Sequence, residues 1–384
     1  MRIVDHLPDD WRDAVLLGRL LTNEGPSPVL VRGGRVVDIS RTCPTSAEAL
    51  ARPDCATLTG EELGDLGTLD LACAWDGGRS GLTLLSPIDL QCIKAAGVTF
   101  AVSAMERVIE ERARGDAGAA QAIRESLSAR IGGDLSKVKP GSEQATLLKA
   151  ALIADGLWSQ YLEVAIGPDA EIFTKAPVLS SVGWGAAVGV RSDSAWNNPE
   201  PEVVLVCDPS GRPVGASLGN DVNLRDIEGR SALLLGKAKD NNASAAIGPF
   251  IRLFDDGFGL DEVRQAAVAL EVTGEDGFEM VGRSSMSMIS RDPEDLVRQA
   301  CGQHHQYPDG FALYLGTMFA PVDDRDAAGQ GFTHHAGDRV RVSSPRLGVL
   351  ENVVAACETA PPWTFGVTAL MRNLAGRGLL GAAS

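Results

Sequence analysis

The stretch that decides the fold runs from Asn197 to Asp226 and reads NNPEPEVVLVCDPSGRPVGASLGNDVNLRD. EVVLVCD has the β-branched and apolar composition of a strand. DPSGRP then places Asp, Pro, Ser and Gly in the order of a turn, and the chain returns as VGASLGND. We therefore expect a hairpin that closes near 209–212 and places Glu200 roughly opposite Asp221.

The open end of this hairpin carries three carboxylates. Glu200 and Glu202 are two residues apart, so they project from the same face of an extended strand. With Asp221 they would repel one another unless a cation is present, and hard oxygen ligands favour Mg²⁺, Ca²⁺ or Mn²⁺ over zinc. A solvated acidic hairpin end is the alternative, because E-x-E alone is a weak motif in a protein with 51 acidic residues.

The second half of the chain has the sequence pattern of a β-rich domain. From about residue 171 onward, short β-type runs alternate with Gly, Pro, Asn and Asp turns, which indicates mainly antiparallel strands. Residues 28–40, PVLVRGGRVVDIS, predict two more short strands around a Gly-Gly turn. We expect an α+β, mainly β fold.

Two stretches in the middle of the chain have helical patterns. Residues 103–131 are rich in Glu, Arg and Ala with helical spacing of apolar residues, and a second helix is predicted to begin near Ser142. The Gly-rich WDGGRSG near residue 80 marks a boundary. It separates a small N-terminal β-containing domain, 1–82, from a larger domain, 83–384.

The charge of the chain excludes one class of partner. Its net charge is −16, from 35 basic and 51 acidic residues, and no basic stripe is interleaved with aromatics. Such a surface repels nucleic-acid phosphates. It would also repel a small anionic substrate at long range, so a site for an acid must supply local positive charge from a metal, Lys or Arg.

The cysteines and the apolar runs bear on location. The seven cysteines are odd in number, widely spaced and without C-x-x-C, which is typical of reduced thiols in a cytosolic protein. MRIVDHLPDDW lacks the apolar region of a signal peptide, and no apolar run approaches the ~18 residues of a membrane span. We expect a cytoplasmic protein that does not enter membranes.

Three segments, PEPEVVLV, GNDVNLRD and KAKDNNASAAIGPF, stand in a characteristic order. They resemble the E-x-E pair, the G-N-D-V-S-x-R-D-like segment and the Lys ahead of Gly-Pro of the fumarylacetoacetate hydrolase family. Asp221 follows Glu202 by 19 residues and Lys239 follows Asp221 by 18, and both spacings fit that family. IFTKAP, LGT, GDRVRV and GVLEN match further family segments, so the resemblance covers about residues 85–355.

The resemblance implies a fold, a cofactor and an assembly. The fold is a coiled, mixed β-roll catalytic domain over 83–384 with a helical insertion at about 103–160. The cofactor is Mg²⁺, with Mn²⁺ able to replace it, bound by Glu200, Glu202 and Asp221. The assembly is a homodimer or a higher homo-oligomer.

One segment departs from the hydrolases of that family, which carry an N-Y-x-x-H-x-x-E-like motif whose His and Glu activate water. Here TFAVSAMERV has Ser103 at the His position and retains Glu106. Without the imidazole there is no obvious base to make hydroxide. This favours the family's dehydratase branch, which makes 2,5-dioxopentanoate from a 2-keto-3-deoxy-pentonate. A C–C hydrolase or 2-keto acid decarboxylase for an acylpyruvate-type or fumarylpyruvate-type acid stays an alternative, and so does a non-catalytic binding protein.

Dehydration needs a base for a C3 proton and an acid for the departing 4-hydroxyl. Lys239 is the candidate base if burial or a nearby cation lowers its pKa, and otherwise a clamp for the substrate carboxylate. Glu106 is the candidate acid. The remaining candidate substrate contacts are Thr317, Ser103, Lys175 and Arg225.

Overall fold

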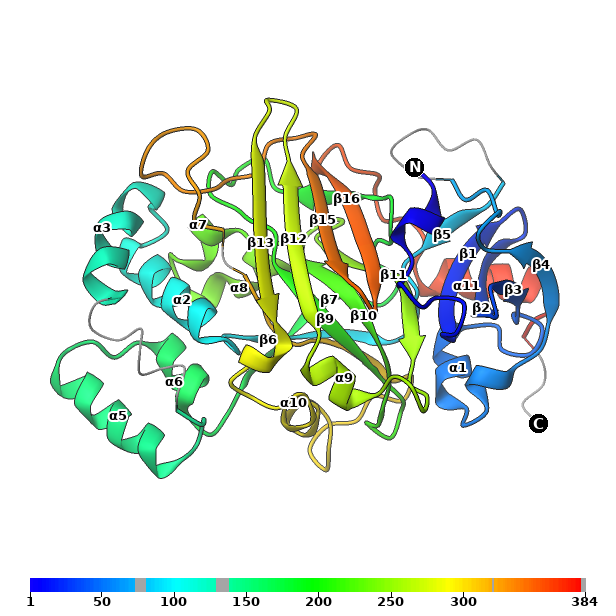
Figure 1. Cartoon of the computed structure of the whole chain (residues 1–384), viewed down its shortest axis with the longest axis horizontal. Helices are drawn as coiled ribbons and strands as arrows, with labels where there is room; N and C mark the ends of the chain where they lie inside the picture. The colour runs from blue at the N-terminus through cyan, green and yellow to red at the C-terminus, as the bar shows by residue number, and fades with distance from the viewer. Residues whose placement is uncertain (73–80, 129–137, 320, 381–384) are drawn as a thin grey trace.

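The computed structural model describes residues 1–72, 81–128, 138–319 and 321–380, and within them the chain forms two β-sheets flanked by helices (Figure 1). The larger sheet has the strand order β4 (Glu61–Asp65), β3 (Arg35–Asp38), β2 (Gly25–Arg32), β1 (Leu16–Thr22), β11 (Ala245–Leu253), β10 (Pro213–Asp221), β9 (Pro201–Cys207), β14 (Phe311–Tyr314), β6 (Cys92–Gly97) and β7 (Glu171–Ala176), with β5 (Thr83–Leu85) paired to β1. The smaller sheet has the order β13 (Glu279–Ser285), β12 (Ala267–Thr273), β15 (Arg339–Ser344), β16 (Gly348–Ala356) and β8 (Ala187–Val190).

Strand pairing is antiparallel throughout these sheets except for β6 with β14 and β8 with β16. The α-helices are α1 (Ser46–Ala51), α2 (Ala101–Ala113), α3 (Ala117–Ser128), α5 (Glu143–Ala154), α6 (Gln160–Ile166), α7 (Arg225–Glu228), α8 (Leu235–Lys239), α9 (Leu260–Arg264), α10 (Pro293–Ala300) and α11 (Val367–Gly376). Short 3₁₀ turns cover Ile3–His6, Cys55–Thr57, Ala232–Leu234 and Met286–Met288. The expected α+β, mainly β fold class is confirmed.

The hairpin of the deciding stretch forms with the predicted register. β9 and β10 are antiparallel, and the backbone N–H of Asp221 donates to the carbonyl of Glu200 at 3.0 Å. In the connecting turn, Asp208 Oδ1 accepts the backbone N–H groups of Ser210 and Arg212. This is the local bonding that makes Asp favourable at turns.

The helices α2, α3, α5 and α6 gather at one end of the molecule (left in Figure 1). The helical stretch expected over 103–131 consists of two helices, because Arg114 adopts a left-handed conformation with φ of 53° and ends α2; positions 129–131 lie outside the described residues. The helix predicted from Ser142 is confirmed, and the Ser142 hydroxyl caps it by accepting the N–H of Ala145 at 3.1 Å.

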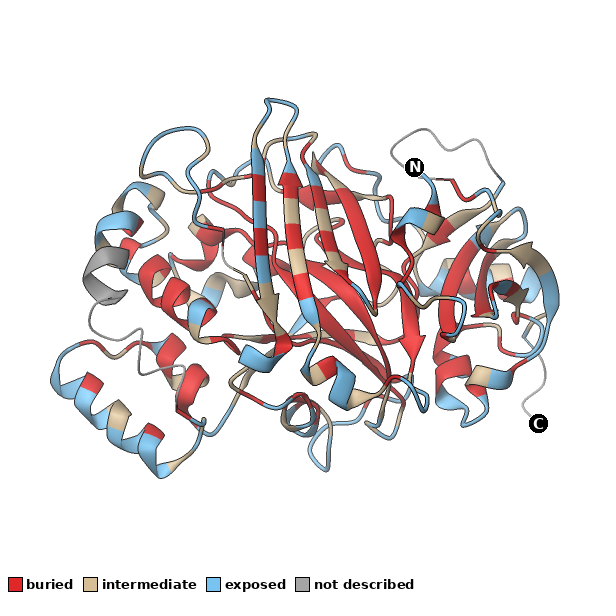
Figure 2. Cartoon of the chain, viewed as in Figure 1, coloured by how far each residue is buried: buried red, intermediate tan, exposed pale blue. Residues whose placement is uncertain are grey.

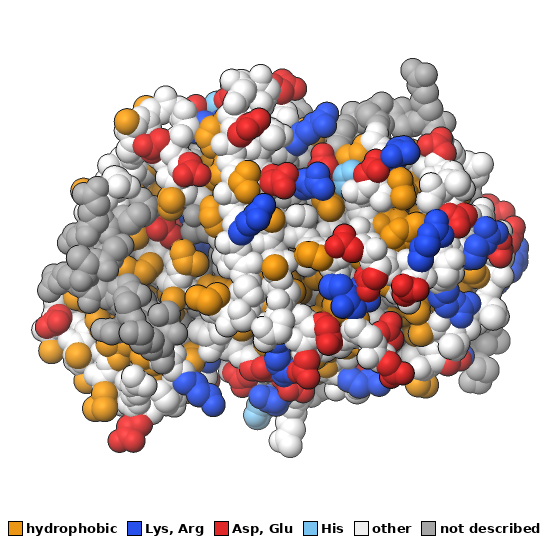
Figure 3. All heavy atoms as spheres, in the orientation of Figure 1, with side chains coloured by type: hydrophobic (Ala, Val, Ile, Leu, Met, Phe, Trp, Pro, Cys, Tyr) orange, Lys and Arg blue, Asp and Glu red, His pale blue; other side chains and the backbone are white. Residues whose placement is uncertain are grey.

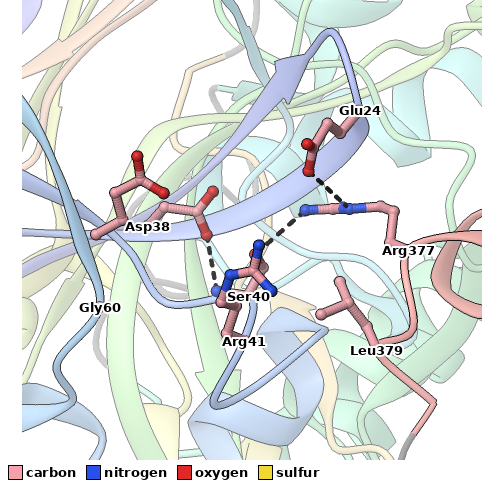
Figure 4. Close-up of a pocket in the computed structure, with 8 residues that line it drawn as sticks. Glu24, Asp38, Ser40, Arg41, Gly60, Arg377 and Leu379 are labelled. Atoms are coloured by element: carbon pink, nitrogen blue, oxygen red, sulfur yellow. Dashed lines mark hydrogen bonds and ion pairs between the residues drawn. The ribbon is translucent and has the colours of Figure 1, made fainter.

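The N-terminal strands extend the larger sheet. β1 pairs with β11, with Leu16 opposite Arg252. α11 packs beside these strands, and Arg377, just after it, donates to Ser40 Oγ at 3.2 Å and lies against Glu24 (Figure 4). Arg377 also donates to Ser27 Oγ at 2.8 Å. The domain division at 82/83 stays a prediction.

The core lies between the two sheets, whose strands are largely buried (Figure 2). Leu205 of β9 belongs to the same apolar cluster as Leu270 of β12 and Val342 of β15. On the described part of the face in Figure 3, acidic and basic side chains are interspersed, and no basic band crosses it. None of the described helices combines the length and the apolarity that crossing a membrane requires.

Candidate active site

Three buried carboxylates meet at the open end of the β9–β10 hairpin. Glu200 directly precedes β9, Glu202 lies within it, and Asp221 ends β10. One oxygen from each carboxylate lies within 4.8 Å of the other two, and the residues are 3%, 1% and 2% exposed. Glu200, Glu202 and Asp221 therefore cluster as their spacing predicts, and the alternative of a solvated acidic hairpin end is wrong.

Hydrogen bonds fix the carboxylate of Glu202 and the backbone of Glu200. The N–H of Gly316 donates to Glu202 Oε2 at 2.7 Å, and the N–H of Glu200 donates to Asn220 Oδ1 at 3.0 Å. Gly316 has a φ of +103°, and a Cβ there would lie 1.9 Å from Thr99 Oγ1. Only glycine can therefore present this N–H to Glu202.

Three cationic side chains surround the triad. Lys175 Nζ lies 2.7 Å from Asp221 Oδ1, and Lys239 Nζ lies 3.1 Å from Asp221 Oδ2. Lys239 also donates to Glu200 Oε2, while Arg107 Nη2 donates to Glu200 Oε1. Both oxygens of Glu200 and both oxygens of Asp221 thus have a cationic partner.

Arg107 is also the centre of a second layer of buried charges. Its Nη1 lies 2.6 Å from Glu110 Oε2 and 3.0 Å from Glu228 Oε2. Glu110 in turn lies 3.0 Å from Arg225, whose Nη1 donates to the carbonyl of Pro321 at 2.9 Å. Arg225 therefore acts on the site indirectly, through its ion pair with Glu110, which in turn pairs with Arg107.

The charge balance tests whether a divalent cation fits. The acids joined in this network or facing the same cavity are Glu110, Glu171, Glu200, Glu202, Asp221 and Glu228, and the bases are Arg107, Lys175, Arg225 and Lys239. If all six acids were ionised, six negative charges would face four positive ones, and buried charge needs compensation. The raised pKa values of Glu171 and Glu202 indicate that protons supply this compensation when no ion is bound. A divalent ion bound by carboxylate oxygens would displace the proton of Glu202 and take over that compensation, so the residues fit Mg²⁺ or Mn²⁺.

A small cavity of about 10 Å³ opens on the triad. Its lining side chains and backbone belong to Ala96, Gly97, Val98, Ser103, Arg107, Glu171, Phe173, Glu200, Glu202, Asp221, Glu228, Lys239 and Thr317. Of the candidate residues, Lys239, Ser103 and Thr317 line it. Glu106, Lys175 and Arg225 are buried but do not line the cavity.

Glu171 was missed by sequence reasoning. It begins β7 opposite Gly97 of β6, and a Cβ at Gly97 would lie 2.2 Å from Glu171 Oε2, so the glycine makes room for the carboxyl group. Burial, reinforced by the charge of Glu228, raises the pKa of Glu171 to about 7. Glu171, Phe173 and Lys175 alternate along β7, so period-two spacing from Lys175 could have indicated it.

The charges around the triad shift two further groups in ways that matter for chemistry. Burial, together with Asp221 and Glu200, raises the pKa of Glu202 well above its ordinary value. Burial alone would lower the pKa of Lys239, but Asp221 and Glu200 outweigh it and raise that pKa above its ordinary value. With these carboxylates as its neighbours Lys239 is charged, so a role as base requires a cation that neutralises them.

Ser103 has a structural task at the start of α2. Its hydroxyl accepts the N–H of Phe100 at 3.2 Å and donates to the carbonyl of Phe100 at 2.8 Å. The position at which the hydrolases carry a histidine is therefore occupied by a helix cap. Among the described residues that line the cavity, none is a histidine.

Comparison with solved structures identifies the fold. Over 89% of this chain and 99% of the other, the structure matches 2-keto-3-deoxy-D-arabinonate dehydratase with a TM-score of 0.62 and 20% identity, in its apo form and in a complex with magnesium and 2,5-dioxopentanoate. The chain has the fold of this dehydratase. It also matches 5-carboxymethyl-2-hydroxymuconate delta-isomerase from Mycobacterium smegmatis, with a TM-score of 0.53 and 18% identity over 89% of this chain and 98% of the other.

Curated relatives carry related names. The chain is 32% identical over 155 residues to 2-dehydro-3-deoxy-D-arabinonate dehydratase of Saccharolobus solfataricus, which is 40% of this chain and 51% of the relative. It is 31% identical over 194 residues to the "Probable 2-keto-3-deoxyxylonate dehydratase" of Haloferax volcanii, which is 50% of this chain and 63% of the relative. The chain thus spans between half and two thirds of the length of these relatives. No protein-family model matches the sequence.

Proposed function

We propose that the chain is a Mg²⁺-dependent hydro-lyase that converts a 2-keto-3-deoxy-pentonate to 2,5-dioxopentanoate and water. The observation that carries the proposal is the buried triad of Glu200, Glu202 and Asp221 beside Lys239 and Glu171 in one cavity. The names of the two curated relatives and the similar structure complexed with magnesium and 2,5-dioxopentanoate support the substrate class.

Glu200, Glu202 and Asp221 would hold the Mg²⁺, and Mn²⁺ could replace it. The ion, when bound, supplies polarisation of the substrate's keto group, which makes the C3 protons more acidic. The side chains of the cavity then have to move protons and orient the substrate. Thr317 lines the cavity and can contact the substrate carboxylate.

Lys239 is the proposed base that removes a proton from C3. Glu171 is the proposed acid that protonates the departing C4 hydroxyl, so that one water leaves and a C3–C4 double bond forms. Proton shifts from C5 to C3 and from the C5 hydroxyl to C4 then give the C5 aldehyde of 2,5-dioxopentanoate. We assign the acid to Glu171 in place of Glu106 because Glu171 lines the cavity and holds a proton near neutral pH.

A C–C hydrolase or decarboxylase remains the competing function. Hydrolysis needs a base that activates water, and at the position of that base Ser103 is bonded to the backbone of Phe100. This observation favours dehydration.

The test is to incubate the purified chain and Mg²⁺ with a panel of 2-keto-3-deoxy acids and acylpyruvates, and to weigh the products by mass spectrometry. Loss of one water from a 2-keto-3-deoxy-pentonate supports the proposal. Carbon-chain scission or loss of CO₂ as the sole reaction would replace it with one of the alternatives.

We also propose a cytoplasmic location and a homodimer or higher homo-oligomer. The six described cysteines are free thiols, which suits a reducing compartment; Cys73 lies outside the described residues. The oligomer rests on the family resemblance, and light scattering of the purified chain would test it.

A further inference from the structure

Arg107 donates a hydrogen bond to Glu200 Oε1, an oxygen that could otherwise bind a metal ion. Arg107 Nη2 bonds Glu200 Oε1, and Lys239 bonds the other oxygen of the same carboxylate. A divalent ion that takes Glu200 as a ligand therefore has to compete with a permanently charged guanidinium.

The guanidinium of Arg107 can leave Glu200 and still keep partners of opposite charge. Its Nη1 lies 2.6 Å from Glu110 and 3.0 Å from Glu228, so two buried carboxylates still neutralise it after it leaves Glu200. Breaking a buried ion pair is expensive mainly when a charge is left without a partner. Arg107 avoids this penalty because Glu110 and Glu228 remain beside it.

The size of the cavity points in the same direction. Its volume of about 10 Å³ is about that of one water molecule. Mg²⁺ usually keeps several of its ligand positions for water or substrate oxygens, so side chains that line the cavity must move before it can be filled. Arg107 lines the cavity from α2 and has partners to withdraw towards.

We infer that Arg107 is a competing counter-ion for Glu200, which sets the affinity of the triad for a divalent cation and moves aside towards Glu110 and Glu228 when that cation binds. This inference rests on the proposed function, because it assigns the triad to a metal. It adds that the affinity of the site is tuned by a residue that is not a ligand.

The test measures binding of Mn²⁺ to the whole chain without substrate, by electron paramagnetic resonance or calorimetry. Arg107→Met removes the competing charge at similar length. Its Kd for Mn²⁺ is expected to fall by at least about tenfold, which corresponds to about 1.4 kcal/mol. A Kd that is unchanged or higher would show that Arg107 instead orients Glu200 for the metal, and it would overturn the inference.

Arg252→Met is the matched control. Arg252 is also a buried arginine with two bonds to one carboxylate, that of Asp10, but it does not contact the triad. Its loss is expected to leave the Kd within about threefold, less than the tenfold that 1.4 kcal/mol produces. A tenfold tightening in this control as well would make the effect one of general charge and would also overturn the inference.

If Arg107→Met does not fold, Arg107→Met with Glu228→Gln removes the acid that loses its ion pair with Arg107, while Glu110 keeps Arg225 at 3.0 Å, and the same criterion applies to it. Mn²⁺ binding by the wild-type chain distinguishes failure of the proposed function from failure of the inference about Arg107. If it binds no Mn²⁺ at all, the proposed metal-dependent function fails. If it binds Mn²⁺ and Arg107→Met does not tighten binding, only the inference about Arg107 fails.

Discussion

Lys175 and Lys239 share one carboxylate. Lys175 Nζ lies 2.7 Å from Asp221 Oδ1, and Lys239 Nζ lies 3.1 Å from Asp221 Oδ2. Lys175 is fully buried and also donates to the carbonyls of Val222 and Lys239, whereas Lys239 lines the cavity. The two lysines thus have different roles around Asp221: Lys175 stabilises the fold, and Lys239 faces the cavity.

Lys175→Met should be strongly destabilising. The substitution leaves the buried Asp221 without its 2.7 Å partner, and removing one member of a buried pair costs about 3–5 kcal/mol. Chemical denaturation of wild type and variant, both in EDTA, would measure the free energy of unfolding.

Lys237→Met is the control for that experiment. Lys237 pairs with Asp193 at 2.9 Å, but the two side chains are 39% and 48% exposed. Exposed pairs contribute about 0–1 kcal/mol, so this variant should unfold close to wild type. Equal effects of the two substitutions would contradict the structural role of Lys175.

Metal removal is the second prediction. EDTA should abolish activity, and added Mg²⁺ or Mn²⁺ should restore it, because in the proposed mechanism the ion bound by the triad polarises the substrate's keto group. Glu202→Gln should weaken Mn²⁺ binding without unfolding the chain, since burial and then the charges of Asp221 and Glu200 raise the pKa of Glu202, so its charge is unfavourable when no ion is bound. Full activity of a sample shown by elemental analysis to hold no metal would refute the assignment.

The triad could be predicted from the sequence because its geometry is local. The turn at Asp208 sets the register of β9 and β10, and that register places Asp221 opposite Glu200. Two-residue spacing puts Glu202 on the same face. The short strands and the start of a helix near Ser142 are equally local, and each was confirmed.

The rest of the cavity depends on pairing between distant segments. Glu171 reaches the site only because β7 pairs with β6, opposite Gly97, and Arg107 only because α2 lies against the hairpin. Period-two spacing puts Glu171 on the same face of β7 as Lys175, but nothing within either segment specifies the pairing that brings these side chains to the triad. The resemblance drew attention to Glu106, one residue before Arg107, and on a helix one residue is about 100° of rotation.

The third prediction compares two glutamates. Glu171→Gln should lower kcat by about 10²–10⁴, the usual effect of losing a general acid. Glu106→Gln should lower it much less, because Glu106 does not line the cavity. Steady-state kinetics on both variants decide between them, and the reverse ranking would return the acid role to Glu106.

The raised pKa of Glu171 adds a pH dependence to this comparison. Its pKa moves from an ordinary value of 4.5 to about 7, so between these values the folded chain holds a proton that the unfolded chain has released. Its contribution to stability therefore declines as pH rises from about 4.5 to about 7. As an acid it also stops donating above about pH 7, so kcat should fall there, and Glu171→Gln should lose both trends.

The last prediction separates the two roles of Lys239. As a base it must be neutral in the working enzyme, although Asp221 and Glu200 raise its pKa in their charged form. A divalent ion bound to these two carboxylates would remove that effect and add a repulsive charge, which lowers the pKa. As a clamp for the substrate carboxylate, Lys239 must instead remain charged.

Lys239→Arg keeps the charge but cannot accept a proton. If Lys239 is the base, the variant should still bind substrate but lose kcat steeply, and the C3 protons of the substrate should no longer exchange with solvent deuterium. If Lys239 is only the clamp, KM should change modestly and C3 exchange should persist. We expect the first result, because Lys239 lines the cavity and because Asp221, at 3.1 Å, can stabilise the positive charge of Lys239 after it accepts the proton. Exchange at the wild-type rate in Lys239→Arg, followed by NMR, would assign the base to another residue.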